Sequence, residues 1–164
     1  MKTPIIRNMK LRPMLAGVIV SCGIAFTAAW ASPGQGTTST AISGPVVLDE
    51  VDTRSESENH QLKLKIKGKS DVYVTRIKVV PGGFSGWHSH PGPSIISVQA
   101  GTATFYQADD LGTPHVYPAG SGFVEDAGRV HLLANEGTED LEIIVMQIVP
   151  LGSPRRIEAP VPVP

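Results

Sequence analysis

The sequence predicts an all-β domain, folded as a small antiparallel barrel or sandwich. Apolar and polar residues alternate with period two over several short segments, as in strands that have one buried face. The chain of 164 residues contains 17 Gly and 14 Pro, which separate these segments and favour tight turns. No segment after residue 31 has the apolar spacing of an amphipathic helix. Together these observations favour many short strands over a helical bundle.

The composition excludes several classes of function. The chain has 14 basic and 15 acidic residues, a formal net charge of −1, so it lacks the basic surplus that binds nucleic acid. Its hydrophobic content of 41% is too high for a disordered chain, and its length suits one domain. A single Cys permits neither an intrachain disulfide nor a cysteine zinc site. The five His therefore remain as candidates for metal chemistry.

Residues 1–31 have the order of a secretory signal peptide. Four basic residues precede an apolar stretch that runs from Met14 to about Ala29, and the whole segment has no acidic residue. Ala29-Trp30-Ala31 then fits the small-x-small rule, with cleavage before Ser32. The apolar stretch is short for a membrane span, which needs about 20 residues. We therefore expect a periplasmic or secreted protein with no stable membrane span after cleavage.

Two alternatives remain for the N-terminus. One is an uncleaved membrane anchor. The other is a lipoprotein, because Ile19-Val20-Ser21-Cys22 resembles a bacterial lipobox in which Cys22 would be lipidated. Cleavage at Ala31 would leave a chain without Cys, which suits an oxidising compartment because no thiol can mispair.

The rest of the chain divides into a flexible leader, a strand-rich core and a tail. Residues 32–44 are rich in Gly, Ser and Thr and predict the leader. Residues 151–164 end in alternating prolines, which favour an extended tail. Residues 45–150 form the expected barrel. Its predicted strands cover residues 62–66, 72–80, 95–98, 102–107, 122–125 and 141–149. The first of these alternates Leu and Ile with Lys, as in a half-buried strand.

Two of the histidines have a spacing that suits a metal site. His88 and His90 are two residues apart, which on a strand puts both imidazoles on one face. His131 follows about forty residues later, after a Gly-rich turn. Neutral imidazole binds several divalent transition metals, among them Fe, Mn, Zn and Ni. His60 and His115 lie in polar surroundings and are expected at the surface.

The residues around these histidines resemble the two sequence motifs of the cupin superfamily. In the first motif, five residues separate Gly82 from His88-Ser89-His90. Three residues then separate His90 from Ser94, and six separate Ser94 from Gly101. In the second motif, five residues separate Gly120 from Asp126-Ala127-Gly128. Two residues then separate Gly128 from His131, and three separate His131 from Asn135. Two positions depart from the pattern, since Ser94 replaces the usual Glu and Asp126 the usual Pro.

The resemblance, which covers residues 82–135, implies a small single-domain cupin. It implies an antiparallel barrel of the jelly-roll type, with a divalent metal held by His88, His90 and His131, and commonly a homodimer. Gly82 and Gly128 fit tight turns because Gly tolerates positive φ, and the Asn135 amide can brace a turn. The superfamily includes dioxygenases, decarboxylases, isomerases, lyases and binding proteins, so it does not fix the reaction.

The departure at Ser94 bears most directly on the metal. Three neutral imidazoles without a carboxylate leave the site with the ion's full charge, which weakens metal binding and favours an anionic substrate. Alternatively, Ser94 marks a site that no longer keeps metal. Glu125 is a candidate to replace the carboxylate, as a ligand or a general base, if it faces inward rather than lying on the barrel rim. Ser94, Trp87, Phe105 and Met146 are candidates to line a ligand pocket.

Three functions agree with these features. The first is a metal-dependent enzyme that acts on a small molecule, an oxygenase if the metal is iron. The second is a cupin that binds a small ligand without turnover. The third is a structural role for the barrel surface.

Overall fold

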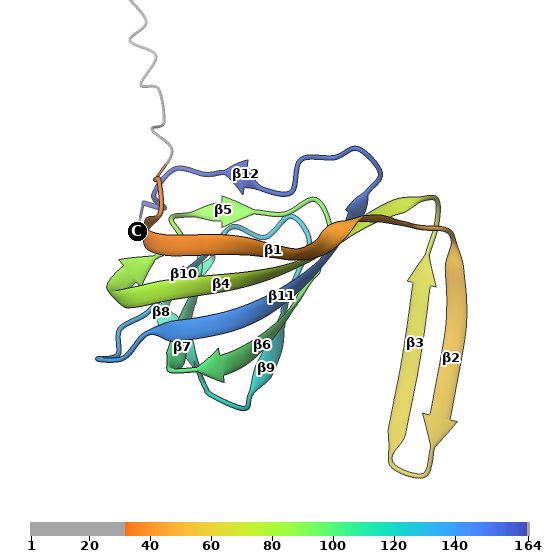
Figure 1. The fold of residues 1–164 in the computed structure, drawn as a ribbon, viewed down its shortest axis with the longest axis horizontal. Coiled ribbons are helices and arrows are strands. Elements are labelled where there is room, and N and C mark those ends of the chain that lie inside the picture. Colours follow the sequence, from red (N-terminus) through yellow and green to blue (C-terminus); the bar gives the residue numbers. More distant parts are fainter. Residues whose placement is uncertain (1–31, 164) are drawn as a thin grey trace, which may run out of the picture.

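The computed structural model describes residues 32–163, and within them the chain forms strands and no helix (Figure 1). The predicted signal peptide, residues 1–31, lies outside the described residues. No helix that could span a membrane is present between residues 32 and 163. The strands are β1 (Gln35–Leu48), β2 (Val51–Ser57), β3 (His60–Ile66), β4 (Ser70–Phe84), β5 (His88–Ser89), β6 (Ser94–Ala100), β7 (Thr102–Gln107), β8 (Asp110–Pro118), β9 (Gly122–Glu125), β10 (His131–Ala134), β11 (Leu141–Pro150) and β12 (Ile157–Glu158).

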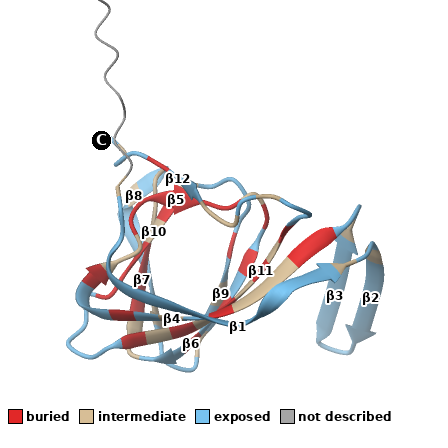
Figure 2. Cartoon of the chain, turned by 45° about the horizontal axis from the view of Figure 1, so that its top comes forward, coloured by how far each residue is buried: buried red, intermediate tan, exposed pale blue. Residues whose placement is uncertain are grey.

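One antiparallel sheet of ten strands curls into a barrel, as the sequence predicts (Figure 2). Its main path runs β12-β5-β10-β4-β11-β6-β9, with β1 added to β4 and β7-β8 added to β10. The longest continuous pairing joins β4 to β11, from Val79 opposite Leu141 to Ser70 opposite Pro150. The strands predicted at residues 72–80 and 141–149 are thus central neighbours in the sheet.

Alternation along the strands fills the barrel with apolar side chains. In β11, Leu141, Ile143 and Val145 are buried, whereas the residues between them are only half-buried. Ile96 and Val98 of β6 are buried opposite them in the register. Each such side chain contributes about 1.5–3 kcal/mol by leaving water. The core therefore consists of cross-strand rows of apolar residues facing inward.

Gly128 and Asn135 act as the sequence predicts, whereas Gly82 lies within β4 and not in a tight turn. Gly82 and Gly128 both have φ of +75°, a conformation that favours glycine. The Asn135 amide donates to the carbonyls of Val79 and Glu139, at 2.8 Å each. Its oxygen accepts from the Gly137 N–H at 3.1 Å. Asn135 thus braces the turn that follows β10.

Strands β2 and β3 form a separate hairpin that projects from the barrel (Figure 1). The strand predicted at residues 62–66 exists as part of β3, but the expectation that it is half-buried is wrong. Leu62 is 52% exposed and Leu64 is 37% exposed, because no other element among residues 32–163 covers either face of the hairpin. Its charged face carries cross-strand pairs such as Lys65 with Asp52, at 2.7 Å.

The expected flexible leader is also wrong from Gln35 onward. Residues Gln35–Leu48 form β1, which pairs antiparallel with β4 along most of its length. The polar composition of this segment concealed the strand, because backbone hydrogen bonds to β4 hold it rather than a buried apolar face.

The tail is not simply extended either. Ile157 and Glu158 of β12 pair with Ser89 and His88 of β5, and Ala159 donates its N–H to the Trp87 carbonyl at 3.0 Å. The segment after β11 therefore returns across the mouth of the barrel, next to the strand that carries His88.

Candidate metal centre

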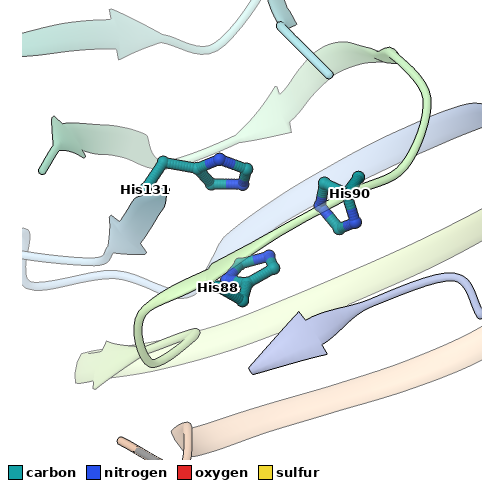
Figure 3. A group of neighbouring side chains, drawn as sticks. All are labelled: His88, His90 and His131. Carbon is teal, nitrogen blue, oxygen red and sulfur yellow. The ribbon is translucent and has the colours of Figure 1, made fainter. Parts of the chain in front are cut away.

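Three short pieces of backbone bring His88, His90 and His131 together. His88 begins β5, His90 follows its end, and His131 begins β10 directly opposite His88 in the register. The Gly128 N–H donates to the His90 carbonyl at 2.8 Å and so ties the turn before β10 to the first histidine pair. Figure 3 shows the three imidazoles facing one another inside the barrel.

The rings are close and buried. Ring centroids are 4.7 Å apart for His88 and His90, 4.5 Å for His88 and His131, and 5.2 Å for His90 and His131. One nitrogen from each ring lies within 4.8 Å of the other two. None of the three residues is more than 6% exposed. The predicted trio is therefore assembled in space.

Each imidazole is held in the tautomer that suits a metal ligand. The Nδ1–H of His88 donates to the Gly86 carbonyl and that of His131 to the Arg129 carbonyl, both at 2.9 Å. The His90 Nδ1 lies 2.6 Å from the Arg155 carbonyl and 3.0 Å from the Gln147 Nε2. The shorter contact assigns the proton to Nδ1, because a carbonyl oxygen only accepts. A proton on Nδ1 leaves the Nε2 lone pair available on every ring, as in metal-bound histidines.

Burial keeps at least two of the rings neutral. It lowers the pKa of His88 to about 2, and the nearby His131 and Arg156 add to this effect. Burial also lowers the pKa of His131, although the Glu125 carboxylate acts in the opposite direction. Only the neutral form of imidazole binds metal, so the site is ready for an ion without first losing protons.

Glu125 places a carboxylate beside the histidines. Its Oε2 lies 3.3 Å from the His90 Nε2 and its Oε1 3.4 Å from the His131 Nε2. Glu125 is only 5% exposed, which excludes the barrel-rim alternative. Two donors that share one ion at about 2.1 Å lie about 3.0–3.4 Å apart, so these separations match those between ligands of one metal.

The donor set fits a divalent transition metal. The Nε2 of His131 is buried and has no hydrogen-bond partner in the described part of the chain, which is costly for a polar atom unless something else binds it. Three imidazole nitrogens and one carboxylate oxygen suit Fe, Mn, Zn or Ni.

Ser94 lies beside Glu125 on the inner face of the barrel. It is fully buried, and its cross-strand partners are Gln147 of β11 and Glu125 of β9. The Gln147 Nε2 lies 3.5 Å from the Ser94 Oγ. The position where the cupin motif expects Glu thus holds a small hydroxyl, and the neighbouring strand supplies a carboxylate.

The other predicted pocket residues do not line the cavity next to the histidines. Trp87 faces away from His88, and its backbone N–H donates to the Ser32 Oγ at 2.7 Å. Met146 lies between Val145 and Gln147, which both face the cavity, so alternation directs it to the outer face. Phe105 is a core residue whose ring lies 5.2 Å from that of His131.

A cavity of about 310 Å³ borders the histidines. Its lining includes His88, His90 and Glu125, together with an apolar wall from β4, β6, β10 and β11. It also includes Gln147, Arg155 and Arg156, which the sequence analysis missed. Arg155 and Arg156 come from the segment predicted to be a tail, and no motif marks them.

The central part of the chain matches a known protein family. Residues 75–147 match the model of the cupin domain family. This segment is a cupin domain. It contains His88, His90, Glu125 and His131, and its matched range begins and ends within central strands of the barrel.

Three solved structures are similar to this chain. The polyketide cyclase RemF from Streptomyces resistomycificus is 17% identical, with 81% of each chain covered and a TM-score of 0.55. A conserved protein with a double-stranded β-helix domain from Klebsiella pneumoniae is 22% identical, covering 68% of this chain and 84% of that one, with a TM-score of 0.47. A predicted oxalate decarboxylase from Thermotoga maritima is 26% identical, covering 51% of this chain and 83% of that one, with a TM-score of 0.42. No curated protein matches the chain.

Proposed function

We propose that the protein binds one divalent transition metal and is a metal-dependent enzyme that acts on a small molecule in the adjoining cavity. The ligands are His88, His90 and His131, with Glu125 as the carboxylate. The observation that carries the proposal is the convergence of three buried imidazoles whose Nδ1–H groups all donate to backbone carbonyls. Protons on Nδ1 leave the Nε2 lone pairs free, and one nitrogen of each ring lies within 4.8 Å of the other two.

The ion, Glu125 and the apolar wall would each have a separate role in the reaction. A bound divalent ion supplies Lewis-acid chemistry, and bound iron adds the redox chemistry of an oxygenase. Glu125 reduces the net charge of the centre and is placed to hold a proton when it is not bound to the ion. The apolar wall excludes water from the substrate, and a buried site strengthens the electrostatic effect of each polar group.

Metal titration tests the proposal. Metal-stripped protein is titrated with Mn²⁺ and with Zn²⁺ by calorimetry, and His88→Ala and His131→Ala are compared with His60→Ala and His115→Ala. We expect one ion per chain, with affinity lost in the first two variants and retained in the two surface variants. Equal affinity in all four variants would refute the assignment.

The second candidate function is that of a cupin that binds a small ligand without turnover. It would bind metal and ligand with the same residues but release the ligand unchanged. Mass spectrometry of candidate ligands after incubation with the metal-loaded protein under air separates the two functions.

We also propose that the protein is exported to the periplasm or secreted, with cleavage before Ser32. The support is the order of basic, apolar and small residues in the first 31 positions. Intact-mass analysis of the exported protein should give a chain that begins at Ser32. A retained Met1, or a lipid on Cys22, would contradict this. The homodimer implied by the cupin resemblance stays a prediction, which light scattering of the same sample measures.

A further inference from the structure

Arg155 brings a positive charge into the cavity without a carboxylate beside it. Among residues 32–163, Arg54, Arg76, Arg129 and Arg156 each pair with an acidic side chain within 4.0 Å, and Arg155 does not. Its Nε donates to the Gln147 Oε1 at 2.9 Å, and its Nη2 donates to the Thr75 Oγ1 at 2.8 Å. Both partners are neutral, so they orient the guanidinium but do not balance its charge.

This guanidinium is partly buried and is held by buried partners. Thr75 is 2% exposed and Gln147 is 5% exposed, and both face into the barrel. The Arg155 guanidinium carbon lies 4.4 Å from the centre of the Tyr73 ring, which fixes the plane of the group by stacking. A guanidinium has five N–H donors, and the two bonds to Gln147 and Thr75 leave the others available. This planar fork matches the paired oxygens of an anion such as a carboxylate.

Much of the remaining wall of the cavity is apolar, although Thr37, Ser39 and Ser85 add hydroxyl groups to it. The apolar part comes from side chains of β4, β6, β10 and β11, namely Ile77, Val79, Ile96, Leu133, Ile143 and Val145. A ligand with an anionic group at one end and an apolar body at the other therefore suits this lining. The volume of about 310 Å³ restricts it to a small molecule.

We propose that the cavity takes a small carboxylic acid with an apolar body, whose carboxylate pairs with Arg155 and whose body packs against this apolar wall. The inference rests on the proposed function, because the metal centre borders the same cavity. It assigns Arg155 as the residue that selects the charge of the substrate, and it places the body of the substrate beside His88 and His90.

Three probes separate charge from shape. Benzoate has both a carboxylate and an apolar body, benzamide has the same shape without the charge, and acetate has the charge without the body. Binding of each to the metal-loaded full-length protein is measured by calorimetry. We expect benzoate to bind at least about tenfold more tightly than benzamide, since a hydrogen bond to a charged group is worth about this factor when buried. We also expect it to bind more tightly than acetate.

Variants then assign the charge preference to Arg155. Arg155→Gln should remove the preference for benzoate over benzamide, and Arg155→Lys should keep part of it. Arg76→Gln is the matched control, because Arg76 lies next to Thr75 on β4 but faces outward and pairs with Glu142. It should leave the preference unchanged.

The outcomes distinguish this inference from the metal proposal. If the protein fails to bind Mn²⁺ or Zn²⁺, the metal proposal is wrong whatever the probes do. If metal binds but benzoate binds no better than benzamide to the unaltered protein, the substrate class is wrong. A preference for benzoate that survives Arg155→Gln in a folded protein overturns the role of Arg155.

Discussion

Ser94 and Glu125 lie directly opposite each other on β6 and β9, both buried on the inner face of the barrel. The cupin motif has its carboxylate at the first of these positions, and this chain has it at the second. The Glu125 oxygens lie 3.3 and 3.4 Å from the Nε2 atoms of His90 and His131. The two residues together account for how a site without the motif Glu can still present a carboxylate to a metal.

Exchanging the two residues tests this relationship. Glu125→Gln should weaken Mn²⁺ binding by about tenfold or more, because loss even of a residue that only supports a metal ligand costs about 10–100-fold. Ser94→Glu alone should lower stability, since it puts two buried carboxylates side by side. The double variant Ser94→Glu, Glu125→Ser returns the carboxylate to the motif position and should recover most of the affinity.

Calorimetry with Mn²⁺ measures all three proteins, and Glu136→Gln at the exposed end of the turn is the control. If Glu125→Gln binds Mn²⁺ as tightly as the unaltered protein, the carboxylate is not a ligand. In that case Glu125 has only the proton-transfer role.

Stability of the metal-free protein should fall as the pH falls below 6.5. The ordinary pKa of His is 6.5, and burial lowers that of His88 to about 2. Between these values the unfolded chain takes up a proton at this residue and the folded chain does not. The stabilisation is therefore complete above pH 6.5 and is lost towards pH 2, at about 1 kcal/mol per pH unit for such a residue. His131 acts in the same direction.

Urea unfolding at pH 7 and at pH 5 checks this dependence, with His88→Gln expected to reduce it and His60→Gln to leave it unchanged. Stability that is equal at both pH values would contradict the lowered pKa. The same lowering means that protons compete with a metal at His88 only well below pH 6, where free imidazole would already release it.

Asn135 should be essential for the stability of the barrel. It is 1% exposed, and its amide satisfies the carbonyls of Val79 and Glu139 and the N–H of Gly137. Asn135→Ala leaves these groups without partners and should cost about 2–4 kcal/mol in urea unfolding, since each unsatisfied buried group costs about 1–3 kcal/mol. Asn59→Ala in the exposed hairpin turn is the control and should change stability by less than about 0.5 kcal/mol. Similar effects of the two substitutions would contradict the bracing role.

The hairpin of β2 and β3 should be dispensable for the metal centre. Leu48 and Ser70 are cross-strand partners, so the ends of β1 and β4 already lie side by side. Replacing residues 50–68 by Asn-Gly should join them with a short turn and leave a folded barrel. Circular dichroism and Mn²⁺ titration check this. A variant that folds but no longer binds Mn²⁺ would show that the hairpin contributes to the site.

The sequence is sufficient for the parts of the site that depend on local spacing. His88 and His90 lie two residues apart next to a short strand, and His131 follows a turn that needs glycine at Gly128, so their convergence could be predicted. The inward direction of Glu125 could not, because a shift of one residue in β9 would turn it outward. The pairing with Ser94 settles its direction.

Two other features were beyond sequence reasoning for different physical reasons. Half of the residues of β1 are Thr, Ser or Gly, and its apolar residues do not alternate with polar ones, so only its hydrogen bonds to β4 define it as a strand. Arg155 reaches Thr75 across 80 positions of sequence, and a contact of that separation leaves no local pattern. The cavity that Arg155 lines depends on how the C-terminal segment packs across the barrel.

The central claim is that the three histidines hold a metal, and metal content tests it most directly. The exported protein is purified without nickel affinity and without chelator, and its metals are quantified by mass spectrometry beside those of His131→Ala. We predict close to one divalent transition metal per chain in the unaltered protein and almost none in the variant. A folded protein that takes up no metal, before or after incubation with Fe²⁺, Mn²⁺, Zn²⁺ and Ni²⁺, would contradict the account.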